Sequence, residues 1–310
     1  MFDTAAKTAF HLLARSTLLG HVAARYGMRR PTSFARRFIA GETVEEAVAA
    51  ARSVEALGLM QTLDYLGESV GTLEEADGAT RDYLRVIDVV TRADIGRNLS
   101  LKLTQLGLDV DRATAVDNLR RILERAAGFF VRIDMESSRY TAATLEIFEL
   151  LWHHEYRNMG VVLQADLHRT EQDVERITAL GARIRLVKGA YKEPKAVAYQ
   201  KKADVDRAFA RLMQKLLAAG NYPAIATHDP FMIDLARQYA TERNIASDRF
   251  EFQMLYGIRR DLQAALVAQG YRVRVYIPFG RQWFPYFMRR LGERPANIAF
   301  VLRGILGESG

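Results

Sequence analysis

The densest group of residues able to do chemistry lies near the C-terminus, in YIPFGRQWFPYFMRRLGERPAN (276–297). On a helix, Tyr286 lies one turn before Arg289 and Arg290, and Arg289 lies one turn before Glu293. Two guanidinium groups suit bidentate recognition of a carboxylate, and a glutamate one turn away can hold one of them in place. An exposed helix face with a single ion pair is the alternative, but it explains the surrounding aromatic residues poorly. We therefore expect this helix to recognise a carboxylate.

Two charged residues interrupt apolar strands. Lys102 lies in LSLKLTQLG (99–107) and Asp134 lies in FFVRIDME (129–136). Either charge is costly in a covered sheet without a partner, and Asp134 is the natural counter-charge to Lys102. Lys102 is open to three interpretations: a structural ion pair, a clamp for an anionic substrate, or a Schiff-base lysine of the kind that aldolase barrels use. Asp134 is equally open as a structural partner or a participant in catalysis.

A second pair of cations precedes a glycine in RLVKGAY (185–191). Gly189 lets the backbone approach a ligand closely, and Arg185 and Lys188 suit a phosphate or an electron-rich ring. Salt bridges to the surrounding helices are the alternative interpretation of both cations.

The segment PAIATHD (223–229) ends an apolar strand on polar residues. His228 could stack on or hydrogen-bond to an aromatic ligand, although a lone histidine is more often structural. Asp229, which precedes a proline, is typical of a helix N-cap. No second histidine or acidic residue stands at ligand spacing, so no metal site is expected. Neither GxGxxG after a strand nor GxxxxGK[ST] occurs, so neither a Rossmann nucleotide site nor a P-loop is supported.

A recurring pattern positions these residues: a short apolar run, a polar or glycine stop, and a longer helical stretch. Apolar strands alternating with amphipathic helices indicate a parallel sheet covered on both faces. Eight such units in roughly 250 residues match a (βα)8 barrel, an α/β fold, better than an open sheet. Nearly every strand ends on a polar residue, Asp64 and Gln253 among them, where a barrel of this type carries its active site. The expected strands are 60–67, 99–107, 129–136, 159–166, 182–191, 223–229, 250–255 and 273–280.

The remaining periodic segments predict helices and a cap. Pro285 is tolerated only near a first turn, so the C-terminal helix should begin at Trp283 or Phe284. Residues 1–57 are interpreted as an N-terminal helical cap on the barrel, and 1–310 as a single domain. Helices are expected at 41–58, 74–93, 111–126, 202–220 and 283–293, followed by a last helix from Asn297.

The composition is that of an ordinary globular protein, with 310 residues of which 49% are hydrophobic and 26% charged. The lack of cysteine excludes disulfides, thiol catalysis and cysteine-ligated metals. The net charge of +7 suggests acidic partners, but the basic residues are spread among acidic ones, so nucleic acid is not expected as a partner. No run of about twenty apolar residues and no signal-peptide core occurs, so the default compartment is the cytoplasm.

Seven segments, in order across 100–297, resemble the signature blocks of proline dehydrogenases. They are SLKLTQLG, RIDME, VVLQA, RLVKGAY, ATHDP, FEFQMLYG and the C-terminal segment described above. The length, without an aldehyde dehydrogenase domain, is similar to that of the bacterial monofunctional enzymes. The resemblance implies a distorted (βα)8 barrel that holds FAD non-covalently at the C-terminal ends of its strands.

The resemblance also implies a reaction and its partners. L-proline would be oxidised to Δ1-pyrroline-5-carboxylate by hydride transfer from C5 to flavin N5, the first step of proline catabolism to glutamate. The electrons would pass to a membrane quinone, during transient peripheral contact with the inner face of the plasma membrane. A separate pyrroline-5-carboxylate dehydrogenase would act downstream.

Roles for individual positions follow from the same resemblance. Lys102, Arg289 and Arg290 would hold the proline carboxylate, with Glu293 orienting Arg289. The pyrrolidine ring would be surrounded by Tyr276, Tyr286 and Leu255.

Asp134 and Arg185 are the implied positions most closely tied to activity. Asp134 would lie in the charge network beside Lys102, and Arg185 would lie near flavin N5. The other implied FAD contacts are Met135, Gln164, Val187, Lys188, Gly189, Ala190, Thr227 and His228.

The chain departs from the family pattern at two positions. Many relatives carry tyrosine where this chain has Phe279 and Phe284, so contacts through those hydroxyls are absent. Tyr286 is retained, whereas relatives that prefer hydroxyproline have a smaller residue there, and this favours proline as substrate. No residue in the blocks is an obvious base for the proline amine, which predicts deprotonation by water or before the reaction.

Two other functions stay open on the residues alone. A Schiff-base aldolase barrel using Lys102 predicts a borohydride-trappable adduct and a colourless protein. A basic binder of nucleic acid or membrane surfaces predicts salt-sensitive binding without a chromophore.

Overall fold

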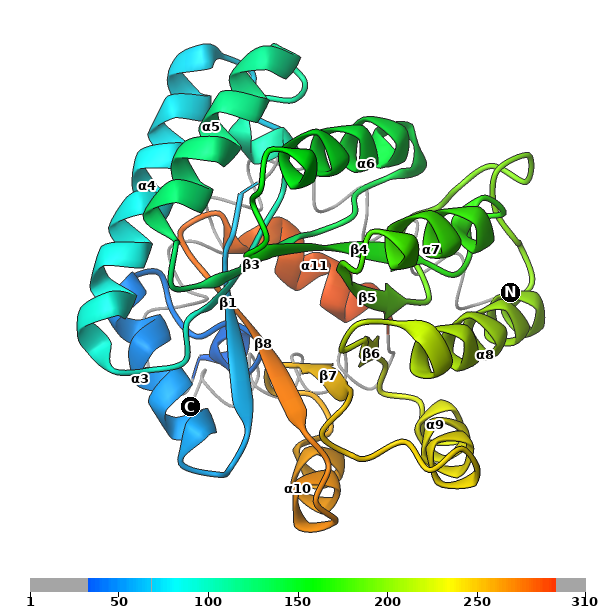
Figure 1. Ribbon diagram of the computed structural model, residues 1–310. Coiled ribbons are helices and arrows are strands. Elements are labelled where there is room, and N and C mark those ends of the chain that lie inside the picture. The colour runs from blue at the N-terminus through cyan, green and yellow to red at the C-terminus, as the bar shows by residue number, and fades with distance from the viewer. Residues whose placement is uncertain (1–32, 68, 294–310) are drawn as a thin grey trace.

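The computed structural model describes residues 33–67 and 69–293, and within them eight parallel strands form a closed barrel in sequence order (Figure 1). The barrel closes because β1 pairs with β8 in register from Met60↔Arg274 to Tyr65↔Phe279. The predicted (βα)8 fold and all eight predicted strands are confirmed. The strands are β1 (Met60–Tyr65), β2 (Asn98–Leu101), β3 (Phe130–Ile133), β4 (Met159–Gln164), β5 (Arg183–Val187), β6 (Ala224–Ala226), β7 (Glu251–Leu255) and β8 (Val273–Phe279).

Seven helices that follow β1 to β7 surround the sheet. The predicted helices at 74–93, 111–126 and 202–220 are confirmed to within a residue at each end, and Asp111 caps its helix by accepting the Thr114 N–H at 2.7 Å. Their apolar stripes pack on the outward side chains of the sheet in one large core. The helices are α4 (Leu73–Ala93), α5 (Arg112–Arg125), α6 (Ser138–His153), α7 (Thr170–Ala179), α8 (Lys202–Ala219), α9 (Pro230–Glu242) and α10 (Arg260–Ala268).

The eighth place in the ring is filled from the other end of the chain. Helix α3 (Val44–Glu55), which precedes β1, packs against both β1 and β8. Its first turn carries a reciprocal capping box between Thr43 and Glu46. The helix predicted at 41–58 is therefore present, with a shorter extent, and it closes the seam where the barrel begins and ends.

Helix α11 (Trp283–Glu293), which follows β8, does not join the ring. Figure 1 shows it inside the circle of helices, and its buried face joins Phe38, Leu66 and the part-buried Tyr276 in a small separate cluster. The predicted start at Trp283 is confirmed. This displacement is the distortion of the barrel, and it brings the helix to the same end as Leu66 and Gly280, which follow β1 and β8.

The interior of the barrel is charged, whereas apolar side chains face the helices. Bonds between strands that are not neighbours must cross the interior: Arg185 of β5 reaches Asp134 after β3, and Tyr276 of β8 reaches the same carboxylate. Arg132, Arg185 and Glu251 are 3%, 5% and 2% exposed. The strand sequences are nearly continuous in apolar residues because charged residues occupy only positions that alternate along a strand and face the interior.

Most strands end earlier than their apolar runs predict, and the early ends of β2 and β3 matter most for the site. Strand β2 ends at Leu101 and is followed by a 3-10 turn, η2 (Thr104–Leu106), while β3 ends at Ile133. Thr104 in this turn bonds to Glu136, so polar contacts replace sheet pairing. As a result Lys102 and Asp134 follow their strands directly, at the C-terminal rim.

Parts of the earlier interpretation lie outside the described residues. They are the helix predicted from Asn297 and residues 1–32 of the predicted cap 1–57. The single domain over 1–310 stays a prediction. None of the helices in the described part of the chain is long and apolar enough to cross a bilayer.

Candidate active site

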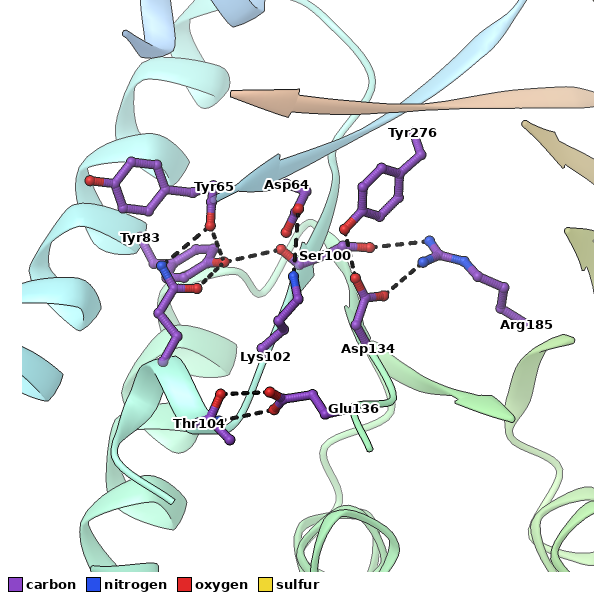
Figure 2. Close-up of polar contacts among 11 residues, drawn as sticks. Asp64, Tyr65, Tyr83, Ser100, Lys102, Thr104, Asp134, Glu136, Arg185 and Tyr276 are labelled. Atoms are coloured by element: carbon purple, nitrogen blue, oxygen red, sulfur yellow. Dashed lines mark hydrogen bonds and ion pairs between the residues drawn. The ribbon is translucent and has the colours of Figure 1, made fainter. Parts of the chain in front are cut away.

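The centre of the C-terminal rim is a buried hydrogen-bonded cluster around Asp134 (Figure 2). Arg185 donates from one guanidinium nitrogen to Asp134 Oδ1 at 2.7 Å and from the other to Ser100 Oγ at 3.1 Å. The Tyr276 hydroxyl donates to Asp134 Oδ2 at 2.7 Å, and the Arg185 guanidinium lies 5.3 Å from the Tyr276 ring centroid. Both oxygens of Asp134 are therefore engaged, and the cluster joins strands β2, β3, β5 and β8.

A second buried pair lies beside this cluster. The Lys102 ammonium is 3.7 Å from Asp64 Oδ2, and Figure 2 shows the two side chains pointing toward each other beside the Asp134 cluster. Asp64 was expected only as a polar strand end, and Asp134 as the partner of Lys102. The structure brings all four charges together but pairs them differently, because β1 and β2 are neighbours while Arg185 reaches Asp134 across the interior.

Burial dominates the electrostatics of these groups. Burial raises the pKa of Asp64. The positive charge of Lys102 opposes this rise, and the negative charge of Asp134 adds to it. Burial and the nearby Asp134 carboxylate raise the pKa of Tyr276 well above its usual value. Tyr276 is therefore a hydroxyl donor throughout the physiological range.

Residues outside the predicted site hold the Lys102 segment in place. Glu136 accepts the Thr104 N–H at 3.2 Å and the Thr104 hydroxyl at 2.6 Å. The Tyr83 hydroxyl donates to Gln105 Oε1 at 3.1 Å. Sequence reasoning missed Glu136, Tyr83 and Ser100 because nothing local marks them; the only signal was that polar residues recur in the strand ends SLK and RIDME.

Helix α11 presents the predicted carboxylate-binding face at the same rim. Tyr286 is buried, Arg289 and Arg290 are half-buried, and the Arg290 guanidinium lies 5.0 Å from the Tyr286 ring centroid. This contact confirms the prediction that Tyr286 and Arg290 lie one helical turn apart on the same face. Glu293 is the last residue of the helix, and its side chain lies outside the described residues, so its predicted bond to Arg289 stays a prediction.

The predicted cofactor residues follow four consecutive strands, β3 to β6. Gln164 donates to the Glu136 carbonyl at 3.0 Å, and Lys188 bridges Asp206 at 2.5 Å and Asp229 at 2.8 Å. Asp229 also caps α9 as predicted, by accepting the Phe231 N–H. His228 Nε2 accepts the N–H of Leu255, which links this arc to the predicted substrate residue at the end of β7. The arc also holds Met135, Val187, Gly189, Ala190 and Thr227.

Two observations fit this arc to a flavin nucleotide. The Nε of Arg185 is buried and donates no hydrogen bond, so it can serve an acceptor on an electron-rich ring. Gly189 has φ +115°, and a Cβ there would lie 2.0 Å from Asp166 Oδ2, so only glycine fits where the chain turns at the rim. The Arg185 guanidinium therefore suits a ring that gains electron density on reduction, whereas Lys188 is already paired with Asp206 and Asp229.

Comparisons with known proteins give a consistent result. The profile of the family described as "Proline dehydrogenase" matches residues 47–303. The chain is 42% identical to "Proline dehydrogenase 2" of Bacillus subtilis (strain 168), over 96% of this chain and 97% of that protein. It is also 42% identical to "Proline dehydrogenase" of Deinococcus radiodurans, over 88% of this chain and 90% of that protein. A crystal structure of proline utilization A from Bdellovibrio bacteriovorus superposes with a TM-score of 0.79 at 27% identity; the match covers 89% of this chain and 34% of that longer one.

Proposed function

The chain belongs to the proline dehydrogenase family and is an oxidoreductase of proline catabolism, and we propose on this basis that it oxidises L-proline to Δ1-pyrroline-5-carboxylate with FAD. The observation that carries the proposal is that α11 packs at the rim that holds Lys102 and the Asp134–Arg185 pair: its Tyr286 shares a cluster with Tyr276, which bonds to Asp134. Lys102 would supply an ammonium group for a carboxylate. Helix α11 would supply two guanidinium groups for the same carboxylate. The pair between them supplies a buried, rigid donor.

The substrate-binding part follows from charge and shape. Proline is a zwitterion, so Lys102, Arg289 and Arg290 would bind its carboxylate and leave the ring to apolar and aromatic neighbours. Tyr276, Tyr286 and Leu255 would contact that ring. Stacking of Arg290 on Tyr286 supports this arrangement, because one side chain then fixes the orientation of the other.

Bound FAD would supply the acceptor for the hydride that leaves proline C5. Arg185 would hold the ring through its buried Nε, while Asp134 and Ser100 fix the guanidinium from the other side. Lys188 and the turn at Gly189 and Ala190 would hold the remainder, with Met135, Gln164, Val187, Thr227 and His228 along the same arc. Positive charge at this place stabilises the electron density that develops on reduction.

Neither carboxylate of the described site is well suited to act as a base for the proline amine, since Asp64 is paired with the Lys102 ammonium at 3.7 Å. Asp134 already accepts hydrogen bonds at both oxygens, from Arg185 and Tyr276. We therefore infer that the amine loses its proton to water or before binding. The expected signature is a rise of kcat/KM with pH that follows the substrate amine. An Asp134→Ala variant would keep this rise, although its rate would fall.

The same proposal extends to partners. The electrons would pass to a membrane quinone, which requires transient peripheral contact with the cytoplasmic face of the membrane. A separate pyrroline-5-carboxylate dehydrogenase would consume the product.

The Schiff-base alternative is less well supported by the geometry. A nucleophilic lysine must be neutral, and the carboxylate of Asp64 at 3.7 Å favours the charged form of Lys102. An anion clamp needs that charged form.

The decisive experiment is a visible spectrum of the purified protein, followed by L-proline in the absence of oxygen. Flavin bands that bleach on addition of proline are expected. A flavin spectrum that ignores proline would contradict the substrate and leave the cofactor standing. A protein that stays colourless after reconstitution with FAD would overturn the proposal, and borohydride trapping at Lys102 would then test the alternative.

A further inference from the structure

We propose that Asp64 is a positioning residue that keeps the Lys102 ammonium charged, and that it thereby sets the alkaline limit of substrate binding. The inference rests on the proposed function, because it takes Lys102 as a ligand of the substrate carboxylate. It assigns a role to a residue that the sequence marked only as a polar strand end.

The geometry of the pair carries the argument. Asp64 is fully buried, and besides Lys102 the Tyr276 hydroxyl, which donates to Asp134, also lies close enough to lower the pKa of Asp64. Its Oδ2 lies 3.7 Å from the Lys102 ammonium, whose side chain is 9% exposed. Asp134 differs in that Arg185 and Tyr276 satisfy both its oxygens. Lys102 is thus the cation that acts most strongly on Asp64, while Asp134 bonds to Arg185.

The neighbours of Asp64 define how the pair responds to pH. Lys102 follows β2, Asp134 follows β3, Arg185 comes from β5 and Tyr276 from β8. Tyr83 of α4 also faces Asp64 and stays neutral, because burial and the Asp64 carboxylate raise its pKa well above the usual value. Tyr276 stays neutral for the same reason. Within residues 33–67 and 69–293, Asp64 and Asp134 therefore face Lys102 and Arg185, and of these two cations Lys102 is the one that can lose its proton.

Removal of Asp64 should affect substrate binding differently at the two ends of the pH range. A buried ammonium loses its proton more easily when a nearby carboxylate is removed, so binding should fail at a lower pH. At low pH Lys102 is charged with or without Asp64, so the loss of Asp64 should change binding little there. A merely structural role would instead weaken binding at every pH.

The test is calorimetric titration of the FAD-loaded protein with tetrahydrofuran-2-carboxylate between pH 6 and pH 10. In this analogue oxygen replaces the amine of proline, so its charge is constant over that range. We expect Asp64→Asn to bind within about threefold of the unchanged protein at pH 6 and at least about tenfold more weakly at pH 9, as a shift of one pKa unit implies. Asp82→Asn is the matched control, since its exposed carboxylate bonds to Tyr65 and its loss changes the net charge equally.

A second variant keeps the proposal falsifiable if Asp64→Asn does not fold. Arginine keeps its proton throughout this range, so Lys102→Arg should bind the analogue without any alkaline loss. A loss that persists in Lys102→Arg, or an Asp64→Asn variant weakened equally at all pH values, would overturn the inference. If the unchanged protein fails to bind the analogue at any pH, the proposed function fails instead.

Discussion

At the scale of single residues, Asp166 is a carboxyl group whose protonation the fold controls. It is 8% exposed and its Oδ1 accepts no hydrogen bond. Burial raises its pKa to about 7, and the charge of Glu193 adds to the rise. Because the native pKa lies above the unfolded one, the protonated form stabilises the fold at low pH. That contribution is lost as the pH rises from about 4 through 7.

Asp166→Asn tests this directly. A pKa raised by about 3 corresponds to about 4 kcal/mol. This is the upper bound of the loss in free energy of unfolding that the ionised Asp166 causes at alkaline pH. The variant should match the unchanged protein in urea unfolding at pH 4.5 and exceed it in free energy of unfolding at pH 8.5. Equal stabilities at pH 8.5 would contradict the buried, unpaired state of Asp166.

Loss of either arginine of α11 should weaken the binding of proline. Arg290 stacks on Tyr286, so Arg290→Ala removes a carboxylate ligand and also frees the ring that would contact the substrate. We expect kcat/KM for proline to fall at least about tenfold, with KM rising in both Arg289→Ala and Arg290→Ala. The exposed Arg281, just before the helix, is the matched control. Unchanged KM in both variants would remove the pair from the substrate site.

At the scale of elements, the turn after β5 depends on one glycine. A Cβ at Gly189 would lie 2.0 to 2.3 Å from the Asp166 carboxyl group, and its φ of +115° disfavours any side chain. Gly189→Ala should therefore displace the Lys188–Ala190 turn and lower the flavin content of the purified protein. Gly181→Ala, at the opposite end of the same strand, is the control: its φ is +71° and nothing lies within 4 Å of the added Cβ. Equal flavin content in the two variants would contradict a role of this turn in cofactor binding.

The elements also show how far sequence reasoning reached. Strand positions followed from apolar runs, because each strand is buried on both sides at most positions. The end of β2 did not, because Lys102, Thr104 and Gln105 leave the sheet through contacts with Asp64, Glu136 and Tyr83 that only the closed barrel creates.

The positions of helices α3 and α11 around the barrel could not be predicted from the sequence either. Periodicity predicted both, but it does not say which of them fills the ring beside β8. The aromatic face of α11 is buried against η1 (Phe34–Arg37) and Phe38 instead, a contact between distant parts of the chain.

At the scale of the whole molecule, the barrel is an apolar shell around a charged interior. At its N-terminal half, Glu251 bonds twice to Arg274, at 2.8 and 2.9 Å, with the buried Arg132 nearby. Burial alone would raise the pKa of Glu251, but Arg274 lowers it overall. The ionised pair therefore stabilises the fold above the unfolded pKa of glutamate and less so on acidification.

Breaking this pair should be costly for the entire barrel. Glu251→Gln leaves two buried guanidinium groups without their carboxylate, which costs about 3–5 kcal/mol. Denaturant unfolding at pH 7 should report that loss, and Glu251→Gln combined with Arg274→Met should recover part of it. A single variant as stable as the unchanged protein would mean that water, not Glu251, compensates Arg274.

The closure of the ring by α3 has a consequence for biosynthesis. Helix α3 and β1 leave the ribosome early, but both pack against β8, and Arg274 of β8 bonds to Gln61, 213 residues away. At about 5–20 residues per second, that separation corresponds to on the order of ten to forty seconds of translation. During this time one edge of β1 and the part of α3 that packs on β8 lack their partner, and this exposure should make the nascent N-terminal segment a client for ribosome-associated chaperones. A codon change that slows translation between β1 and β8 should lower the soluble yield without altering a single residue.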